Sequence, residues 1–222
     1  MEYISNNKEL NKAIIQMYQR EIDPYQLADI YLKYKLYSAA STYYVMQLND
    51  LHNCKKEEYQ LKSYCFGKLA ECYYNQQKDH IFSGWQLSLI YDMCKEAIGY
   101  DRNNLVAYLI LGKCQILRNN IKDAYFTYND MILNLPNVID FDPQYIPLFV
   151  NVIIEYFNLC ELFYIIKYEH IYRNIINFML KFPWFTYKDI KKVNERYQNH
   201  LDKITEYELD IMEGNIQKYY YP

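Results

Sequence analysis

Few residues in this sequence have the types and spacing that site chemistry requires. His52 and Cys54 could provide two metal ligands. Cys65 and Cys72 could provide two others from one helix. A zinc site needs three or four protein ligands, and no second pair here has ligand spacing. The six cysteines form no CxxC pair and mostly lie in apolar stretches, which favours free buried thiols in a reducing compartment. We therefore expect a turn histidine and packed thiols, with no metal site.

Patterns typical of nucleotide binding or catalysis do not occur either. No GxGxxG or P-loop pattern is present, and the five glycines are too scattered to cradle a phosphate. Ser5 and Lys8 have the spacing of a Ser-x-x-Lys nucleophile, but they lie in a polar N-terminal stretch without the partner motifs of such enzymes. The sequence predicts no catalytic residue, no cofactor and no enzyme.

Two acidic side chains have unusually apolar neighbours. Glu155 and Glu161 lie in the stretch 145–166, and carboxylates in such surroundings must be paired, protonated or facing a groove. We expect an ion pair or an exposed edge. Asp140 and Asp142 flank a phenylalanine in a turn, where Asp142 is adequately explained as a helix cap.

The apolar stretch 145–166 is also long enough to be tested as a membrane span. It contains Pro147 and several polar residues, and its two central acids would each cost about 2.5–3.5 kcal/mol on an insertion scale. A buried pair of helices is the preferred interpretation, and a membrane-associated adaptor is the alternative.

Charge and composition limit the classes of partner. A net charge of -3 and a pI near 5.8 offer no basic field for a phosphate backbone, so we expect no nucleic acid. The N-terminus shows no signal or transit pattern, and we expect an intracellular, cytoplasmic protein.

Apolar residues recur at three- and four-residue steps almost throughout, which predicts an all-α fold. The 28 tyrosines follow the same spacing, so their rings should be buried with the hydroxyls at a wet edge.

One stretch carries a specific pattern, in which an aromatic residue is followed by a Leu-Gly pair, a small residue, a second aromatic and a closing proline. These residues are Tyr108, Leu111, Gly112, Ala124, Tyr128 and Pro136. The order and spacing resemble the tetratricopeptide repeat, a 34-residue helical hairpin. Gly112 and Ala124 would lie where the two helices cross closely, so only small side chains fit. The match departs from the family pattern at Gln115 and Met131.

Two weaker copies of this pattern precede it. The first copy comprises Leu27, Ala28, Tyr31, Ala40 and Tyr44, and the second comprises Phe66, Leu69, Ala70, Tyr73 and Ala97. Three helical hairpins are therefore expected, pairing 24–36 with 37–51, 61–74 with 86–99, and 105–117 with 121–135. The second copy is about eight residues too long, which predicts a loop over 75–85. A similar excess at 51–58 is expected to extend the preceding helix.

The repeats set the expected organisation of the chain. An N-terminal helix should occupy 1–22, the repeats 23–136, a degenerate helical hairpin 137–183 and a charged last helix 184–222. That last helix bears an apolar stripe at heptad-like spacing. Terminal units of solenoids need a polar outer face, so we expect a capping helix, with a homodimeric coiled coil as the alternative.

The resemblance implies a superhelix of stacked hairpins whose groove binds a protein or peptide. The chain would then be a scaffold or a subunit of a larger assembly, or else an accessory arm of an enzyme complex. The predicted groove residues lie on the first helix of each hairpin and are Lys33, Lys68, Glu71 and Lys113. Lys68 and Lys113 could engage an acidic or C-terminal carboxylate ligand.

Overall fold

The computed structural model describes residues 8–77, 82–163 and 169–212, with the side chains of 207–212 excepted. The described residues form an all-α fold without strands, as the periodicity predicts. The chain divides into two compact units, Met1–Asn120 and Ile121–Pro222, and each is considered by itself.

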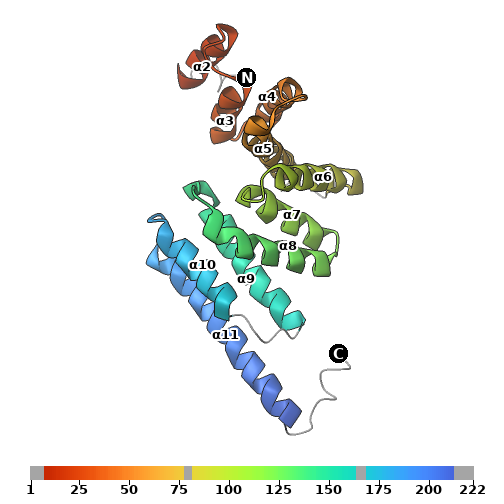
Figure 1. The fold of residues 1–222 in the computed structure, drawn as a ribbon, viewed down its shortest axis with the longest axis vertical. Coiled ribbons are helices and arrows are strands. Elements are labelled where there is room, and N and C mark those ends of the chain that lie inside the picture. Colours follow the sequence, from red (N-terminus) through yellow and green to blue (C-terminus); the bar gives the residue numbers. More distant parts are fainter. Residues whose placement is uncertain (1–7, 78–81, 164–168, 213–222) are drawn as a thin grey trace. The chain divides into compact units, whose positions relative to one another are not determined.

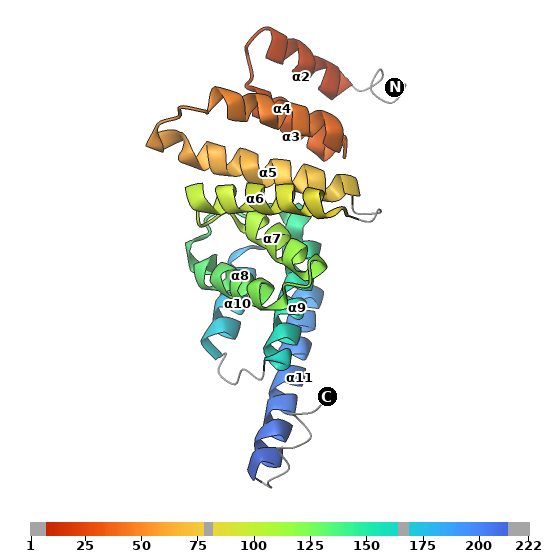
Figure 2. The same ribbon diagram turned by 90° about the vertical axis from the view of Figure 1, so that its right-hand side faces the viewer.

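The first unit is a stack of helices that pack in sequence order. Its α-helices are α2 (Lys8–Tyr18), α3 (Pro24–Lys33), α4 (Tyr37–Asp50), α5 (Tyr59–Gln77), α6 (Gly84–Tyr100) and α7 (Leu105–Leu117), with a 3-10 turn η1 (Lys56–Glu58) before α5. Each helix packs on the one before it, and α5 also contacts α7 (Figures 1 and 2). The hairpins predicted from the first two copies, α3 with α4 and α5 with α6, are confirmed. The predicted pairing of 105–117 with 121–135 joins the two units and stays a prediction.

One predicted connection in this unit is wrong, and a second is shorter than predicted. The excess at 51–58 does not extend α4, which ends at Asp50 and is followed by a turn and η1. The predicted loop over 75–85 is shorter than expected, because α5 continues to Gln77 and α6 begins at Gly84. Residues 78–81 lie outside the described residues.

Helix ends follow from local chemistry. α3 begins at Pro24, where the first predicted hairpin begins, because proline suits the first helical position after a capping Asp23. The backbone N–H of Asp23 donates to Oε1 of Gln26 at 2.8 Å. The same helix ends in a Schellman motif, in which Lys35 has a left-handed φ of 58°. In this motif Leu36 N–H donates to the carbonyl of Tyr31 at 2.9 Å, and Lys35 N–H donates to that of Leu32 at 2.8 Å.

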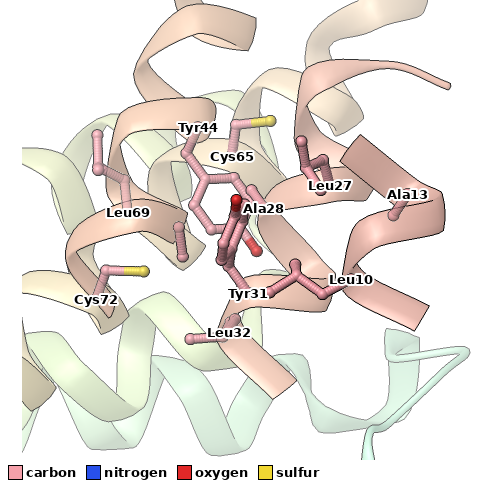
Figure 3. Close-up of a cluster of buried hydrophobic side chains, with 11 residues drawn as sticks. Leu10, Ala13, Leu27, Ala28, Tyr31, Leu32, Tyr44, Cys65, Leu69 and Cys72 are labelled. Carbon is pink, nitrogen blue, oxygen red and sulfur yellow. The ribbon is translucent and has the colours of Figure 1, made fainter. Parts of the chain in front are cut away.

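The core of the first unit lies between successive helices. One cluster joins α2, α3, α4 and α5, and its members, drawn in Figure 3, include Leu10, Ala13, Leu27, Ala28, Tyr31, Leu32, Tyr44, Cys65, Leu69 and Cys72. A second cluster joins α5, α6 and α7 through residues that include Ala70, Ile90, Cys94, Ala97, Leu111 and Cys114. The helices therefore bury their apolar faces against neighbours along the chain, as in helical repeat proteins.

The second unit contains four α-helices among its described residues. They are α8 (Ile121–Asn134), α9 (Ile146–Leu162), α10 (Glu169–Lys181) and α11 (Tyr187–Met212), and 3-10 turns η2 (Leu135–Asn137) and η3 (Pro143–Tyr145) connect α8 to α9. α8 ends just before Pro136, as predicted, and the Asp142 side chain caps η3 by accepting from Gln144 N–H at 3.0 Å. The hairpin predicted over 137–183 corresponds to α9, which extends to Leu162, and α10, which begins at Glu169.

α9 packs against α11 and α8, and it meets α10 through aromatic rings. Five phenylalanines form the core at one end of this unit, namely Phe141, Phe149, Phe178, Phe182 and Phe185. The first residues of the apolar stripe on α11 pack inside this unit. Val193 is buried, and the ring of Tyr197 lies 5.5 Å from that of Phe157. This packing supports the capping interpretation. The division of the chain into four predicted segments stays a prediction.

One helical segment among the described residues, Pro143–Leu162, is long and apolar enough to cross a membrane by length and composition. Half of its apolar window is buried inside the structure. Its buried residues include Phe149, Ile153, Tyr156 and Phe157, so these side chains contribute to the core of the second unit.

Candidate partner-binding surface

The predicted groove residues differ widely in exposure. Lys33, near the end of α3, keeps 63% of its side chain exposed and forms an ion pair with Glu9 of α2 at 2.9 Å. Tyr34 donates to Oε2 of the same carboxylate at 2.5 Å. The hydrogen bonds from Tyr34 and Lys33 lower the pKa of Glu9. Lys33 is thus an accessible cation. Its partner Glu9 belongs to α2, which lies outside the predicted repeats.

Lys68 and Glu71, predicted as groove residues on α5, are both buried. Their side chains are 8% and 10% exposed, and Lys68 Nζ lies 3.6 Å from Glu71 Oε2. The same ammonium lies 5.5 Å from the ring centroid of Tyr64. Burying a charge is costly unless an opposite charge accompanies it. Lys68 is therefore not on an exposed surface, because residues 68 and 71 lie one helical turn apart on a covered face.

Lys113 lies on α7 and is half-buried. Of the four predicted residues, only Lys33 and Lys113 offer a charged side chain with appreciable exposure. The structure brings Lys68 and Glu71 together as a pair, and the partner-binding role of all four stays a prediction.

A polar cluster that sequence analysis missed connects three helices of the first unit. The Asp29 carboxylate on α3 accepts hydrogen bonds from Tyr44 on α4 at 2.5 Å and from Tyr64 on α5 at 2.7 Å. Burial, together with the neighbouring charge of Asp29, raises the pKa of both phenols. The ring of Tyr44 is fully buried. Tyr44 thus has a buried ring and a hydroxyl with a polar partner, as predicted for the tyrosines. Asp29 lies where the first hairpin meets the second.

Of the two acids with apolar neighbours, Glu161 forms ion pairs, as expected, whereas Glu155 is half-buried beside a tyrosine hydroxyl. Glu155 accepts from Tyr128 at 3.2 Å. Glu161 lies 2.5 Å from an Arg196 nitrogen and 2.8 Å from Lys203 Nζ. Burial raises the pKa of Glu161, but the hydrogen bonds from Arg196 and Lys203 outweigh this effect and hold the pKa below its ordinary value.

His200 completes the charged cluster between α9 and α11. It is fully buried, packs against the ring of Phe157 at 5.9 Å, and places Nδ1 3.9 Å from Oε1 of Glu161. Burial lowers the pKa of His200, and the nearby Arg196 and Lys203 lower it further, while Glu161 acts in the opposite direction. The cluster therefore attaches α11 to α9 around a single carboxylate.

The structure describes most of the residues considered for metal or nucleophile chemistry. His52 is exposed and contacts the Asn53 side chain at 3.1 Å. Cys65 and Cys72 are buried in the core, and burial raises the pKa of each thiol to about 12. Across the described ranges, no group of three or more His, Cys, Asp or Glu side chains is placed to hold a metal ion. Ser5 lies outside the described residues.

The residues that carry the repeat resemblance lie mainly in the core. Those that are buried are Leu27, Ala28, Tyr31, Ala40, Tyr44, Leu69, Ala70, Ala97, Tyr108, Leu111, Gly112, Ala124 and Tyr128. Phe66 and Tyr73 are partly buried and pack against the same clusters. Small residues at fully buried helical positions indicate close approach between helices.

Sequence and structure comparisons do not place the chain in a family. No protein-family model, no curated protein and no solved structure matches it.

Proposed function

We propose that this chain is a non-catalytic scaffold that binds a polypeptide partner through a tetratricopeptide-like helical repeat. The proposal rests on one arrangement of small and left-handed residues that recurs in two of the predicted hairpins. In the first copy, Ala28 is followed by the left-handed Lys35 and then by Ala40. In the third copy, Gly112 and Asn119 have the same spacing, and Asn119 is also left-handed, with a φ of 61°.

The same two hydrogen bonds close the first helix in both copies. Asn120 N–H donates to the Gln115 carbonyl at 2.8 Å, and Asn119 N–H donates to that of Ile116 at 2.9 Å, which repeats the Schellman motif of α3. A left-handed residue that is not glycine is uncommon, although Arg20 closes α2, outside the predicted repeats, with the same motif. The support for an internal repeat therefore comes from the equal spacing of Ala28 to Lys35 and of Gly112 to Asn119. The second small residue follows at the same distance in each copy, at Ala40 and Ala124.

A repeat of this kind buries its core between neighbouring helices and leaves a long face whose side chains need no internal partner. Lys68 and Glu71 are buried and are therefore not part of that face. The proposed contact surface comprises accessible positions of the first helices α3 and α7. Its cations are Lys33, which also pairs with Glu9, and the half-buried Lys113. An anionic peptide suits this surface, because charged rim residues steer and orient an oppositely charged partner.

The test is affinity capture of the partner from native extract, followed by quantitative binding of that purified partner. The variant Lys33→Gln/Lys113→Gln removes two charges without placing a carboxylate beside Glu9. The matched control Lys55→Gln/Lys56→Gln removes two exposed lysines from the α4–α5 connection. We expect the first variant to bind more weakly at low salt, a smaller difference at high salt, and wild-type binding by the control.

Equal binding by both variants would exclude these lysines from the contact surface. Failure to recover any stoichiometric polypeptide partner, together with turnover of a small substrate by the purified chain, would contradict the scaffold assignment.

A further inference from the structure

The turn between α10 and α11 exposes large apolar side chains. Leu180, Trp184 and Tyr187 are 66%, 51% and 81% exposed, although they lie within eight residues of one another. We call residues 180–192 the basic aromatic turn. Isolated exposed apolar residues are normal on a protein surface, but three together with a tryptophan call for an explanation.

Loose packing does not explain this exposure, because the turn is fixed to the core. Phe182 and Phe185 alternate with the exposed residues and are buried, and their ring centroids lie 5.9 Å and 5.5 Å from that of Phe141. The Phe185 N–H donates to the Phe182 carbonyl at 3.3 Å. In addition, Lys181 Nζ donates to the carbonyl of Val138 at 2.5 Å. The turn thus holds Trp184 on the outside of a well-packed segment.

The charge of the basic aromatic turn has the opposite sign to that of the whole chain. It contains four lysines, Lys181, Lys188, Lys191 and Lys192, against a single acid, Asp189, whereas the chain carries a net charge of -3. The Asp189 carboxylate is occupied as a cap, because it accepts from the Thr186 hydroxyl at 2.6 Å and from the Thr186 N–H at 2.9 Å.

Helical spacing gathers the exposed groups on one side of α11. Tyr187, Lys188, Lys191 and Lys192 stand at steps of one, three and four residues, which places them on one continuous face of the first two turns. All four are exposed, whereas Val193 on the opposite side is fully buried. The apolar anchors and the lysines therefore share the same end of the helix.

Residues 138–142, which pack against this turn, add an apolar side chain and two acidic ones. Ile139 is 89% exposed. Asp140 and Asp142 are also exposed there, and the Asp142 carboxylate caps η3. On the lysine face of α11, Lys191 forms an ion pair with Glu195 at 3.6 Å, so the attraction for an anionic surface must come mainly from Lys188 and Lys192.

We propose that the basic aromatic turn attaches this protein peripherally to an anionic lipid bilayer. Leu180, Trp184 and Tyr187 enter the interfacial region, where amphipathic aromatic rings are favoured. Lys188 and Lys192 lie among the anionic headgroups, and juxtamembrane lysines are attracted to such a surface. A bilayer suits the turn better than a protein partner does, because lysine is depleted in protein interfaces. This attachment is separate from α9 and does not require the proposed scaffold function.

The full-length chain with Trp85→Phe reports on the turn directly, since Trp184 is then the only tryptophan. Trp85 is 68% exposed, so its replacement should leave the fold intact, and circular dichroism checks this. The probes are vesicles of phosphatidylcholine alone and of phosphatidylcholine mixed with phosphatidylserine. We expect the Trp184 emission to shift to shorter wavelength, and the protein to sediment, with the mixed vesicles at low salt and not with phosphatidylcholine alone.

Charge reversal then tests the lysine face. In the same background, Lys188→Glu/Lys192→Glu should weaken binding to the mixed vesicles by about tenfold or more. The control Lys55→Glu/Lys56→Glu makes the same change in net charge in the first unit and should bind as the parent does. The proposal is overturned if the Trp184 emission does not respond to the mixed vesicles, or if both lysine pairs have the same effect. Docking of a protein on the turn without vesicle binding would also overturn it.

Discussion

His200 lies fully buried with its Nδ1 3.9 Å from Oε1 of Glu161, a carboxylate that already contacts Arg196 and Lys203. A protonated His200 would be a third cation beside one carboxylate, in a place from which water is excluded. The folded state therefore favours the neutral imidazole, and its pKa lies below the ordinary value of 6.5.

This pairing predicts a pH dependence of stability. Because the folded pKa of His200 is lowered, the unfolded chain binds the proton more readily, and the free energy of unfolding should fall as the pH drops below about 6.5. The contribution is fully present above that pH and is lost as the pH approaches the folded pKa. Denaturant unfolding between pH 7.5 and 5 measures it. The variant His200→Gln should show a smaller decrease over this range, and an identical decrease would contradict the assignment. Glu161 acts in a separate range, below its ordinary pKa near 4.5.

The two cations around Glu161 should differ in their contribution. The Arg196 side chain is 14% exposed and that of Lys203 is 64% exposed. Solvent screens exposed ion pairs, so Lys203→Met should change the free energy of unfolding by about 0.5 kcal/mol or less. Arg196→Met leaves a largely covered carboxylate with one partner fewer and should cost about 1–3 kcal/mol. Thermal unfolding at neutral pH ranks the two, and a larger effect at Lys203 would mean that the cluster is arranged differently.

Gly67 on α5 has no room for a side chain. A Cβ at this position would lie 2.9 Å from the amide nitrogen of Asn104, which is held in place because it donates to the Ser63 carbonyl at 2.9 Å. Gly67→Ala should therefore destabilise the protein by about 1–3 kcal/mol. Gly99→Ala is the control, because it lies in α6 with nothing within 4 Å of its Cβ and should be neutral or stabilising by about 0.5–1 kcal/mol. If both variants unfold alike, α5 and the start of α7 do not approach as described.

The buried pair on α5 predicts strong coupling between its members. Lys68→Met leaves the Glu71 carboxylate with one opposite charge fewer in a covered position and should cost about 3 kcal/mol. Replacing both residues with Met removes both desolvation costs, so the double variant should lose less stability than the two single variants added together. A double-mutant cycle in chemical denaturation measures this difference. Additive losses would contradict a direct interaction between Lys68 and Glu71.

Sequence reasoning predicted the helices better than the surroundings of individual side chains. Asp23-Pro24 and Pro136 mark helix limits through backbone chemistry that depends on a few neighbouring residues, and the structure agrees with both. The end of α5 could not be placed, because no proline or glycine lies between Asn75 and Phe82 to stop the helix.

Burial of charged residues depends on residues distant in the sequence. Lys68 looks like an ordinary helix surface lysine, and only its position three residues before Glu71 hints at a pair. Asp29 similarly gave no signal, because its partners Tyr44 and Tyr64 lie 15 and 35 residues away. The left-handed residues at Lys35 and Asn119 were missed because neither is glycine.

Site-specific photo-crosslinking to the purified partner is the most direct test of the scaffold proposal. The crosslinking residue would replace Lys33 on α3 or Lys113 on α7, and the controls would replace Thr42 on α4 or Lys95 on α6, both exposed on second helices. Our account predicts crosslinks to the partner from positions 33 and 113 and none from 42 and 95. Crosslinks from the second helices alone, or from none of the four positions, would contradict binding through the first helices of the repeat.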